Sequence, residues 1–255
     1  MRTATAIVTG GSSGIGLVAV RRLAAAGTKV AAVDIDAAGL DELCAGTDGV
    51  RAYPCDISDE GAVASMVDAV TADLGPIDHV FHAAGICRID LAVHQPMSDI
   101  KALFDVNLFG TVNICRAVVP GMLERDRGSL VIISSLAGWL PSPKFSAYAA
   151  SKAAATAYAE ALSNELHGTN VRLSCVCPTE VDTPLARNVR TIDGSAFGDM
   201  RAMSVDAFMN HVERKIAKKR PPLFVFPGVA GPLWRARRFA PDFLRKQTLR
   251  QTSRP

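Results

Sequence analysis

The sequence predicts an α/β protein with a doubly wound parallel sheet of about seven strands and helices on both faces. Short runs rich in Val, Ile, Leu and Ala alternate with segments of helical periodicity along most of the 255 residues. This alternation is typical of β-strands joined by crossover helices. Many of the short runs are continuously apolar, as in strands that are buried on both faces of a sheet.

The expected elements follow in chain order. Strands are expected at 5–10, 29–35, 50–56, 77–85, 129–135, 171–177 and 221–228. Helices are expected at 14–26, 37–44, 60–74, 97–124 and 147–167. Gly27 and Gly75 end the first and third helices, because glycine readily takes the left-handed conformation that follows a helix. Pro120 is expected to kink or end the fourth helix, since proline has no N–H to donate.

Composition favours a single domain, residues 1–255, because 49% of the chain is hydrophobic and can bury a large core. No uninterrupted run of 18 apolar residues is present, so we expect no membrane-spanning helix. A strand is expected almost at the N-terminus, in the place that a cleavable signal peptide would occupy, so we expect no such peptide.

The six cysteines lie apart and show no metal-ligand spacing. Cys175 and Cys177 are two residues apart on an expected strand, which places them on one face as small core residues. We therefore expect neither a metal site nor disulfides, and a reducing cytoplasmic location.

The charge is unevenly distributed. Residues 214–255 carry 12 Lys and Arg against one acidic residue, a net charge of +11, whereas residues 1–213 carry 16 against 24, a net charge of −8. Aromatic side chains stand among the arginines of the basic tail. Three interpretations remain open: weak contact with a membrane surface, docking on a partner subunit of a homo-oligomer (dimer or tetramer), and a solvated end. Nucleic acid is not an expected partner, because no recognition motif accompanies the charge.

The first chemical motif is TGGSSGIG at residues 9–16, between an expected strand and a helix. Its glycines permit a tight turn and close backbone approach to a pyrophosphate. Asp34 ends the second strand, 18 residues after Gly16, where it can accept hydrogen bonds from a ribose and repel a 2′-phosphate. This pattern predicts NAD rather than NADP. The candidate cofactor residues here are Gly10, Ser12, Ser13, Gly14, Ile15, Gly16, Asp34 and Ile35. Asp36 is the better candidate for capping the next helix.

The second motif lies between residues 135 and 152. Tyr148 and Lys152 are four residues apart, so they share a helix face. A free tyrosine has a pKa near 10, and an adjacent ammonium is expected to lower it towards neutral pH. Ser135 can donate a hydrogen bond to the same substrate oxygen. These three residues are suited to moving a proton on or off an alcohol.

These motifs, in this order, resemble the short-chain dehydrogenase/reductase family in its single-domain, Rossmann-type branch. The resemblance covers residues 3 to about 184, with a variable substrate loop and helix at 185–220 and the last strand and basic tail at 221–255. It implies that Asn107, Ser135, Tyr148 and Lys152 are catalytic, with Asn107 holding a water of the proton relay. It further implies that Tyr148 and Lys152 contact the cofactor, together with Asp56, Ile57, Ala83, Gly85, Pro178, Val181 and Thr183.

Two positions depart from the family pattern. His82 stands in HAAG, where the family usually has NNAG, and is expected to be a packed residue rather than an acid–base group. Thr179 replaces a glycine in PTEVDT, which puts the local turn shape in doubt.

The resemblance implies an NAD-dependent oxidoreductase that transfers a hydride between a secondary alcohol or ketone and NAD. Apolar residues after Pro184 suggest a lipophilic, steroid-like or hydroxy-lipid substrate, or equally an ordinary core; they are Leu185, Phe197, Met200, Met203, Phe208 and Met209. Trp139 and Leu140 are further candidates for the pocket. The alternatives are a 3-oxoacyl or other ketone reductase, and a non-catalytic nucleotide-sensing scaffold. The scaffold is disfavoured because all four catalytic side chains are present.

Overall fold

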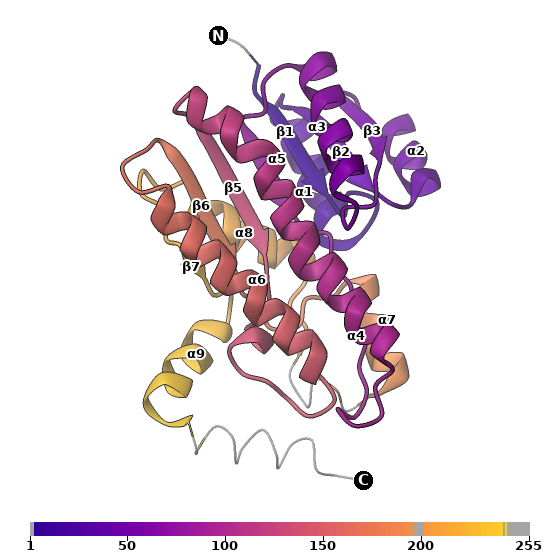
Figure 1. The fold of residues 1–255 in the computed structure, drawn as a ribbon, viewed down its shortest axis with the longest axis vertical. Helices are drawn as coiled ribbons and strands as arrows, with labels where there is room; N and C mark the ends of the chain where they lie inside the picture. The colour runs from indigo at the N-terminus through magenta and orange to yellow at the C-terminus, as the bar shows by residue number, and fades with distance from the viewer. Residues whose placement is uncertain (1–2, 195, 197–200, 242, 244–255) are drawn as a thin grey trace.

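A computed structural model of the chain describes all residues except 1–2, 195, 197–200, 242 and 244–255 (Figure 1). Its centre is one parallel sheet of seven strands in the order β3-β2-β1-β4-β5-β6-β7. The predicted fold class is therefore confirmed. The strands are β1 (Thr5–Thr9), β2 (Lys29–Asp34), β3 (Val50–Pro54), β4 (His79–His82), β5 (Gly128–Ile133), β6 (Val171–Val176) and β7 (Phe224–Val225).

Helices cover both faces of the sheet (Figure 1). The helices are α1 (Gly14–Ala25), α2 (Ala37–Ala45), α3 (Glu60–Leu74), α4 (Met97–Phe104), α5 (Gly110–Glu124), α6 (Ser146–Glu165), α7 (Pro184–Ile192), α8 (Val205–Ile216) and α9 (Ala230–Phe239). One core lies between the sheet and α3, α5 and α6, and the other between the sheet and α1, α2 and α8. Ile7 and Val8 of β1 belong to different cores, because successive strand side chains point to opposite faces.

The strand order reverses at β1, which lies between β2 and β4. Loops that leave β1 and β4 consequently diverge to opposite sides, and a crevice forms beyond the carboxyl ends of these strands. β4 ends at His82, three residues earlier than the sequence predicts, so Ala83–Gly85 form a loop at this crevice.

The predicted helix over 97–124 is present, but it contains a π-helical turn at Asp105–Phe109. Pro120 does not end this helix, which continues to Glu124. Within the described part of the chain, this is the helix long and apolar enough to cross a membrane by length and composition. It contains no uninterrupted run of 18 apolar residues, because polar and charged side chains interrupt it. Its apolar side chains, including Ile114, Val118 and Met122, are buried in the core shared with α3 and α6, as in the central helix of a globular domain.

Two helices, α7 and α8, lie in the segment that was expected to hold the substrate loop and one helix. Both begin with recognisable signals: the side chains of Thr183 and Ser204 accept hydrogen bonds from the backbone N–H three residues later, and Pro184 occupies the first turn of α7. The last strand, expected over 221–228, is reduced to Phe224–Val225.

Phe208 of α8 is fully buried in the core between the sheet and α1. We predict that Phe208→Ala lowers the free energy of unfolding by about 3–5 kcal/mol, because it removes a large apolar side chain and leaves a cavity. Urea denaturation measures this change. Ile192→Ala is the matched control, since Ile192 is 60% exposed and its truncation should cost less than about 1 kcal/mol. Equal losses in the two variants would contradict the placement of Phe208 in the core.

Candidate active site

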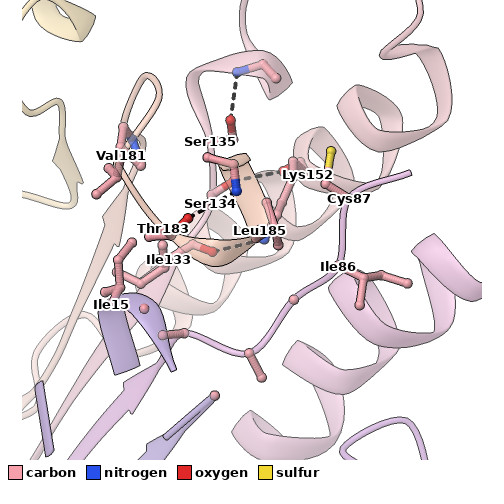
Figure 2. Close-up of a pocket in the computed structure, with 18 of the residues that line it drawn as sticks. Ile15, Ile86, Cys87, Ile133, Ser134, Ser135, Lys152, Val181, Thr183 and Leu185 are labelled. Carbon is pink, nitrogen blue, oxygen red and sulfur yellow. Dashed lines mark hydrogen bonds between the residues drawn. The ribbon is translucent and has the colours of Figure 1, made fainter. Parts of the chain in front are cut away.

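A cavity of about 920 Å³ opens beyond the carboxyl ends of the central strands. It is lined by every residue that the sequence singles out for catalysis or cofactor binding except Ser12 and Asn107. Figure 2 shows that these residues come from distant parts of the chain: Ile15 follows β1, Ser135 follows β5, and Val181 and Thr183 follow β6. The predicted motifs therefore lie together at the carboxyl ends of the strands.

The glycine loop is shaped by two residues with positive φ, Gly10 at 69° and Gly14 at 53°. A Cβ at Gly10 would lie 2.9 Å from the backbone N of Ala84, and one at Gly16 would lie 2.0 Å from the carbonyl oxygen of Gly10. No other residue type fits these positions without moving backbone. The loop leads into the N-terminus of α1, where the Ser13 side chain makes no capping bond. Unpaired N–H groups at such a terminus suit a pyrophosphate, so this loop fits a dinucleotide.

Asp34 is held by Ser12. The backbone N and the Oγ of Ser12 donate to Asp34 Oδ2 at 3.0 and 2.7 Å, and the backbone N of Asp36 donates to Oδ1 at 3.1 Å. Ser12 thus orients the acidic side chain from behind and does not line the cavity, whereas Asp34 does. Asp36 caps α2 by accepting from the backbone N of Gly39, as predicted.

The adenine side of the cavity contains Ile35, Asp56 and Ile57. Ile35 is 73% exposed, which is unusual for an isoleucine and leaves it available as a contact surface. The Ile57 carbonyl accepts from Asn113 Nδ2 at 3.0 Å, so α5 fixes this loop.

His82 is a structural residue, as predicted. It is buried between the hydroxyls of Thr9, 2.7 Å from Nδ1, and Thr111, 3.0 Å from Nε2. The Thr111 hydroxyl donates to the Asn107 carbonyl, so it accepts from His82 Nε2–H, and the Thr9 hydroxyl donates to Nδ1. Burial lowers the pKa of His82 to about 3. The neutral ring therefore ties β1 and β4 to the start of α5.

Asn107 lies in that π turn and is 1% exposed. Its Nδ2 donates to the Ile86 carbonyl and to Ser151 Oγ, both at 3.0 Å, and its Oδ1 accepts from the Ile86 backbone N at 2.9 Å. The side chain thus clamps the loop after β4 against α6. A Cβ at Gly85 would lie 3.0 Å from Asn107 Oδ1 and 3.2 Å from Lys152 Nζ, so glycine is needed beside this clamp.

Ser135, Tyr148 and Lys152 line one end of the cavity. Ser135 Oγ accepts from the backbone N of Ala137 at 3.1 Å, so its O–H remains a donor, and Tyr148 is a hydrogen-bond partner of this hydroxyl. Lys152 is 7% exposed, and its Nζ donates to the Ile133 carbonyl at 3.1 Å (Figure 2). Burial lowers the pKa of Lys152 to about 8.

The pKa of Tyr148 differs from the sequence expectation. Burial raises it above the ordinary value, the neighbouring Cys87 adds to this, and the hydrogen bond with Ser135 acts in the opposite direction. The lowering expected from Lys152 is not found: the shift comes from burial, Cys87 and Ser135, and the cost of burying a phenolate is the largest of the three.

Much of the remaining cavity wall is apolar. Its lining includes Ile86, Cys87, Leu140, Phe145, Leu185, Ala196, Val229, Pro232 and Leu233. Two of the predicted pocket residues, Leu140 and Leu185, are among them. Trp139 is not, because it packs against Phe224, Phe226 and Trp234. Met203, Phe208 and Met209 belong to the core behind the sheet, while Phe197 and Met200 lie outside the described residues.

An ion pair that the sequence did not indicate borders the cavity. Glu180 is buried in the lining, and both of its carboxylate oxygens accept from the Arg190 guanidinium of α7. The neighbouring Val181 forms a bridge with Met203. These contacts fasten α7 over the cavity. The sequence Thr183-Pro184 indicates the start of α7. The orientation of α7, and with it the Glu180–Arg190 pair, depends on tertiary packing, which local sequence does not indicate.

Comparison with known proteins identifies the family. The family described as short chain dehydrogenase matches residues 4–193. The chain is 38% identical over 196 residues to 1-deoxy-11-beta-hydroxypentalenate dehydrogenase of Streptomyces avermitilis, covering 74% of this chain and 73% of that protein. It is 30% identical over 235 residues to 2,3-dihydro-2,3-dihydroxybenzoate dehydrogenase of Bacillus subtilis, covering 89% and 90%. A solved serine dehydrogenase complexed with NADP⁺ superposes with a TM-score of 0.81 at 28% identity, covering 87% of this chain and 93% of that one.

The chain therefore belongs to the short-chain dehydrogenase/reductase family. It is accordingly an oxidoreductase that acts on the CH–OH group of donors.

The buried ammonium of Lys152 makes stability depend on pH. Its pKa falls from 10.5 when exposed to about 8 in the fold, so between these values the unfolded chain binds more protons and stability rises with pH. The full difference corresponds to about 3 kcal/mol. We predict that Lys152→Met abolishes this rise and is more stable than the parent below pH 8.

Urea denaturation of both proteins across that pH window measures the effect. The difference between the two free energies is the relevant quantity, because it cancels titrating groups that both proteins share. Parallel pH profiles would contradict the burial of a charged Lys152.

Proposed function

We propose that the chain is an NAD-dependent dehydrogenase of a lipophilic secondary alcohol. The observation that carries this proposal is a single cavity in which Ser135, Tyr148 and Lys152 lie at one end and the glycine loop and Asp34 at the other. A proton-transfer group and a dinucleotide cradle are the two parts that alcohol oxidation requires.

The residues present would hold NAD along the carboxyl edge of the sheet. The glycine loop and α1 suit the pyrophosphate, Asp34 the ribose hydroxyls, Asp56 and Ile57 the adenine, and the loop from Pro178 to Thr183 the nicotinamide. When bound, the nicotinamide supplies the acceptor for the hydride that leaves the carbinol carbon. The Asp34 carboxylate favours NAD over NADP, because it would repel a 2′-phosphate. Relatives of known structure include complexes with NADP⁺ and with NAD, so the choice for this chain is inferred from Asp34.

The chain's own residues manage the proton. Ser135 donates its O–H to the substrate oxygen and stabilises the charge that develops there. Tyr148 takes the hydroxyl proton as the C–H bond breaks. Its pKa must fall for this step. The hydrogen bond with Ser135 acts in that direction, and the ammonium of Lys152, one helical turn away, is proposed to do the same. Asn107 positions the loop beside Lys152, and its water-holding role remains a prediction.

The substrate is proposed to be lipophilic because apolar side chains, among them Leu140, Phe145, Leu185 and Leu233, line the cavity. Apolar linings of this kind bind apolar molecules, and a few polar groups fix their orientation.

A 3-oxoacyl reductase is the second candidate. It is favoured by 34% identity over 187 residues to 3-oxoacyl-[acyl-carrier-protein] reductase FabG of Thermotoga maritima, covering 72% of this chain and 76% of that protein. A panel of secondary alcohols with NAD⁺ and of ketones with NADH and NADPH, followed by absorbance, separates the two. The homo-oligomeric state and the cytoplasmic location stay predictions.

Tyr148→Phe tests the proton carrier. We predict that it lowers turnover on the best substrate of that panel by at least about 10²-fold, the lower end of general acid–base catalysis. NAD binding should change little, because the phenyl ring is kept; intrinsic fluorescence titration with NADH is the measurement. Turnover near that of the parent would remove Tyr148 from its proposed role.

Asp34→Ala tests the choice of nucleotide. The loss of one charged acceptor should weaken NAD binding by roughly 1.5–3 kcal/mol, and the loss of its repulsion should improve NADP binding. Ser12→Ala keeps the carboxylate but removes the 2.7 Å bond that orients it, so a smaller loss of NAD affinity is expected. Equal affinities of the parent for NAD and NADP would overturn the argument from Asp34.

A further inference from the structure

The helix α9 has two different sides. Ala230 is fully buried, and Pro232 and Leu233 line the apolar part of the cavity wall. Arg235 and Phe239, one helical turn apart, share a face that points away from the fold. Phe239 is 82% exposed, and Phe243 is 60% exposed. One short helix therefore forms a wall of the cavity and also presents aromatic and basic side chains to the exterior.

Aromatic contacts fix α9 in this position. Trp234 stacks on Phe226 with ring centroids 4.9 Å apart and meets Trp139 edge-on at 6.1 Å. Trp139 in turn contacts Phe224 of β7 at 5.3 Å. These contacts hold α9 against the sheet beyond the carboxyl end of β7 (Figure 1). Phe239 is therefore exposed on a helix that is held in place by the packing of Trp234.

The helix α9 is basic: Ala230–Phe239 contains arginines and no acidic residue, and Arg235 is exposed. Residues 230–255 contain seven Lys and Arg and one acidic residue, a net charge of +6, although the chain before residue 214 is acidic. Exposed large aromatic side chains among arginines suit the interface of an anionic bilayer, where the rings enter the headgroup region and the cations bind the lipid charge. A second protein copy that docked through the same helix would bring the same positive charge and be repelled.

We propose that the face of α9 carrying Arg235 and Phe239 docks on anionic lipid membranes. Docking there would place the apolar wall formed by Pro232 and Leu233 next to the bilayer, from which a lipophilic molecule can enter the cavity. The docking surface goes beyond the proposed reaction and does not depend on it.

Co-sedimentation of the full chain with vesicles tests this surface. We expect binding to equimolar phosphatidylserine and phosphatidylcholine vesicles at low salt, weaker binding at high salt, and little binding to phosphatidylcholine alone. The variant Arg235→Glu should lower the partition coefficient at least roughly five-fold, since each basic residue near the surface contributes a factor of about five. Phe239→Ala should lower the binding that persists at high salt.

The matched control is Lys219→Glu, which makes the same change in charge. Lys219 is exposed and precedes β7, on the side of the amino ends of the strands. The six residues of the neighbouring β6 span about 20 Å, which exceeds the Debye length of about 10 Å. The control should therefore bind nearly as well as the parent.

Three results would overturn the proposal. The first is equal binding of the parent to neutral and anionic vesicles. The second is an equal loss in the lysine control, which would show attraction by total charge rather than by α9. The third is a change of oligomeric state in the arginine variant, measured by size-exclusion chromatography with light scattering, which would make α9 an assembly surface. The vesicle measurement needs no turnover, so its failure is distinguishable from failure of the proposed reaction.

Discussion

The site depends on keeping a charged lysine inside the protein. Lys152 stands on α6 with little contact with solvent, and the Ile133 carbonyl accepts from its ammonium. Burying this charge is costly, and the surroundings are arranged around it. Gly85 leaves room for the ammonium, Asn107 clamps the adjacent loop, and Tyr148 lies one turn away. The lowered pKa of Lys152 expresses that cost.

Much of this arrangement could be predicted from local patterns. The apolar runs located every strand, and the glycine loop followed by Asp34 indicated the dinucleotide cradle, because each signal lies in a few neighbouring residues. The Tyr148–Lys152 pair was readable for the same reason, since helix geometry fixes residues four apart.

Contacts between distant segments could not be predicted in this way. The hydroxyls of Thr9 and Thr111 meet on His82 only after β1, β4 and α5 have packed. The Glu180–Arg190 pair likewise depends on where α7 comes to rest. The raised pKa of Tyr148 follows from the depth of its burial, which the spacing of two residues does not reveal. Sequence patterns thus identified the chemistry, and packing determined its electrostatics.

The π turn at Asp105–Phe109 sets how α5 is rotated about the helix axis relative to α4. The segment before it packs on α6 beside the site, and the segment after it packs on α3 in the core. Each residue added to or removed from a helix turns everything beyond it by about 100°. Packing therefore constrains the length of this turn as strictly as it constrains the side chains of the site. An insertion or deletion there would rotate α4 relative to α5, so that one of the two would present the wrong face to its neighbours, whatever its residues.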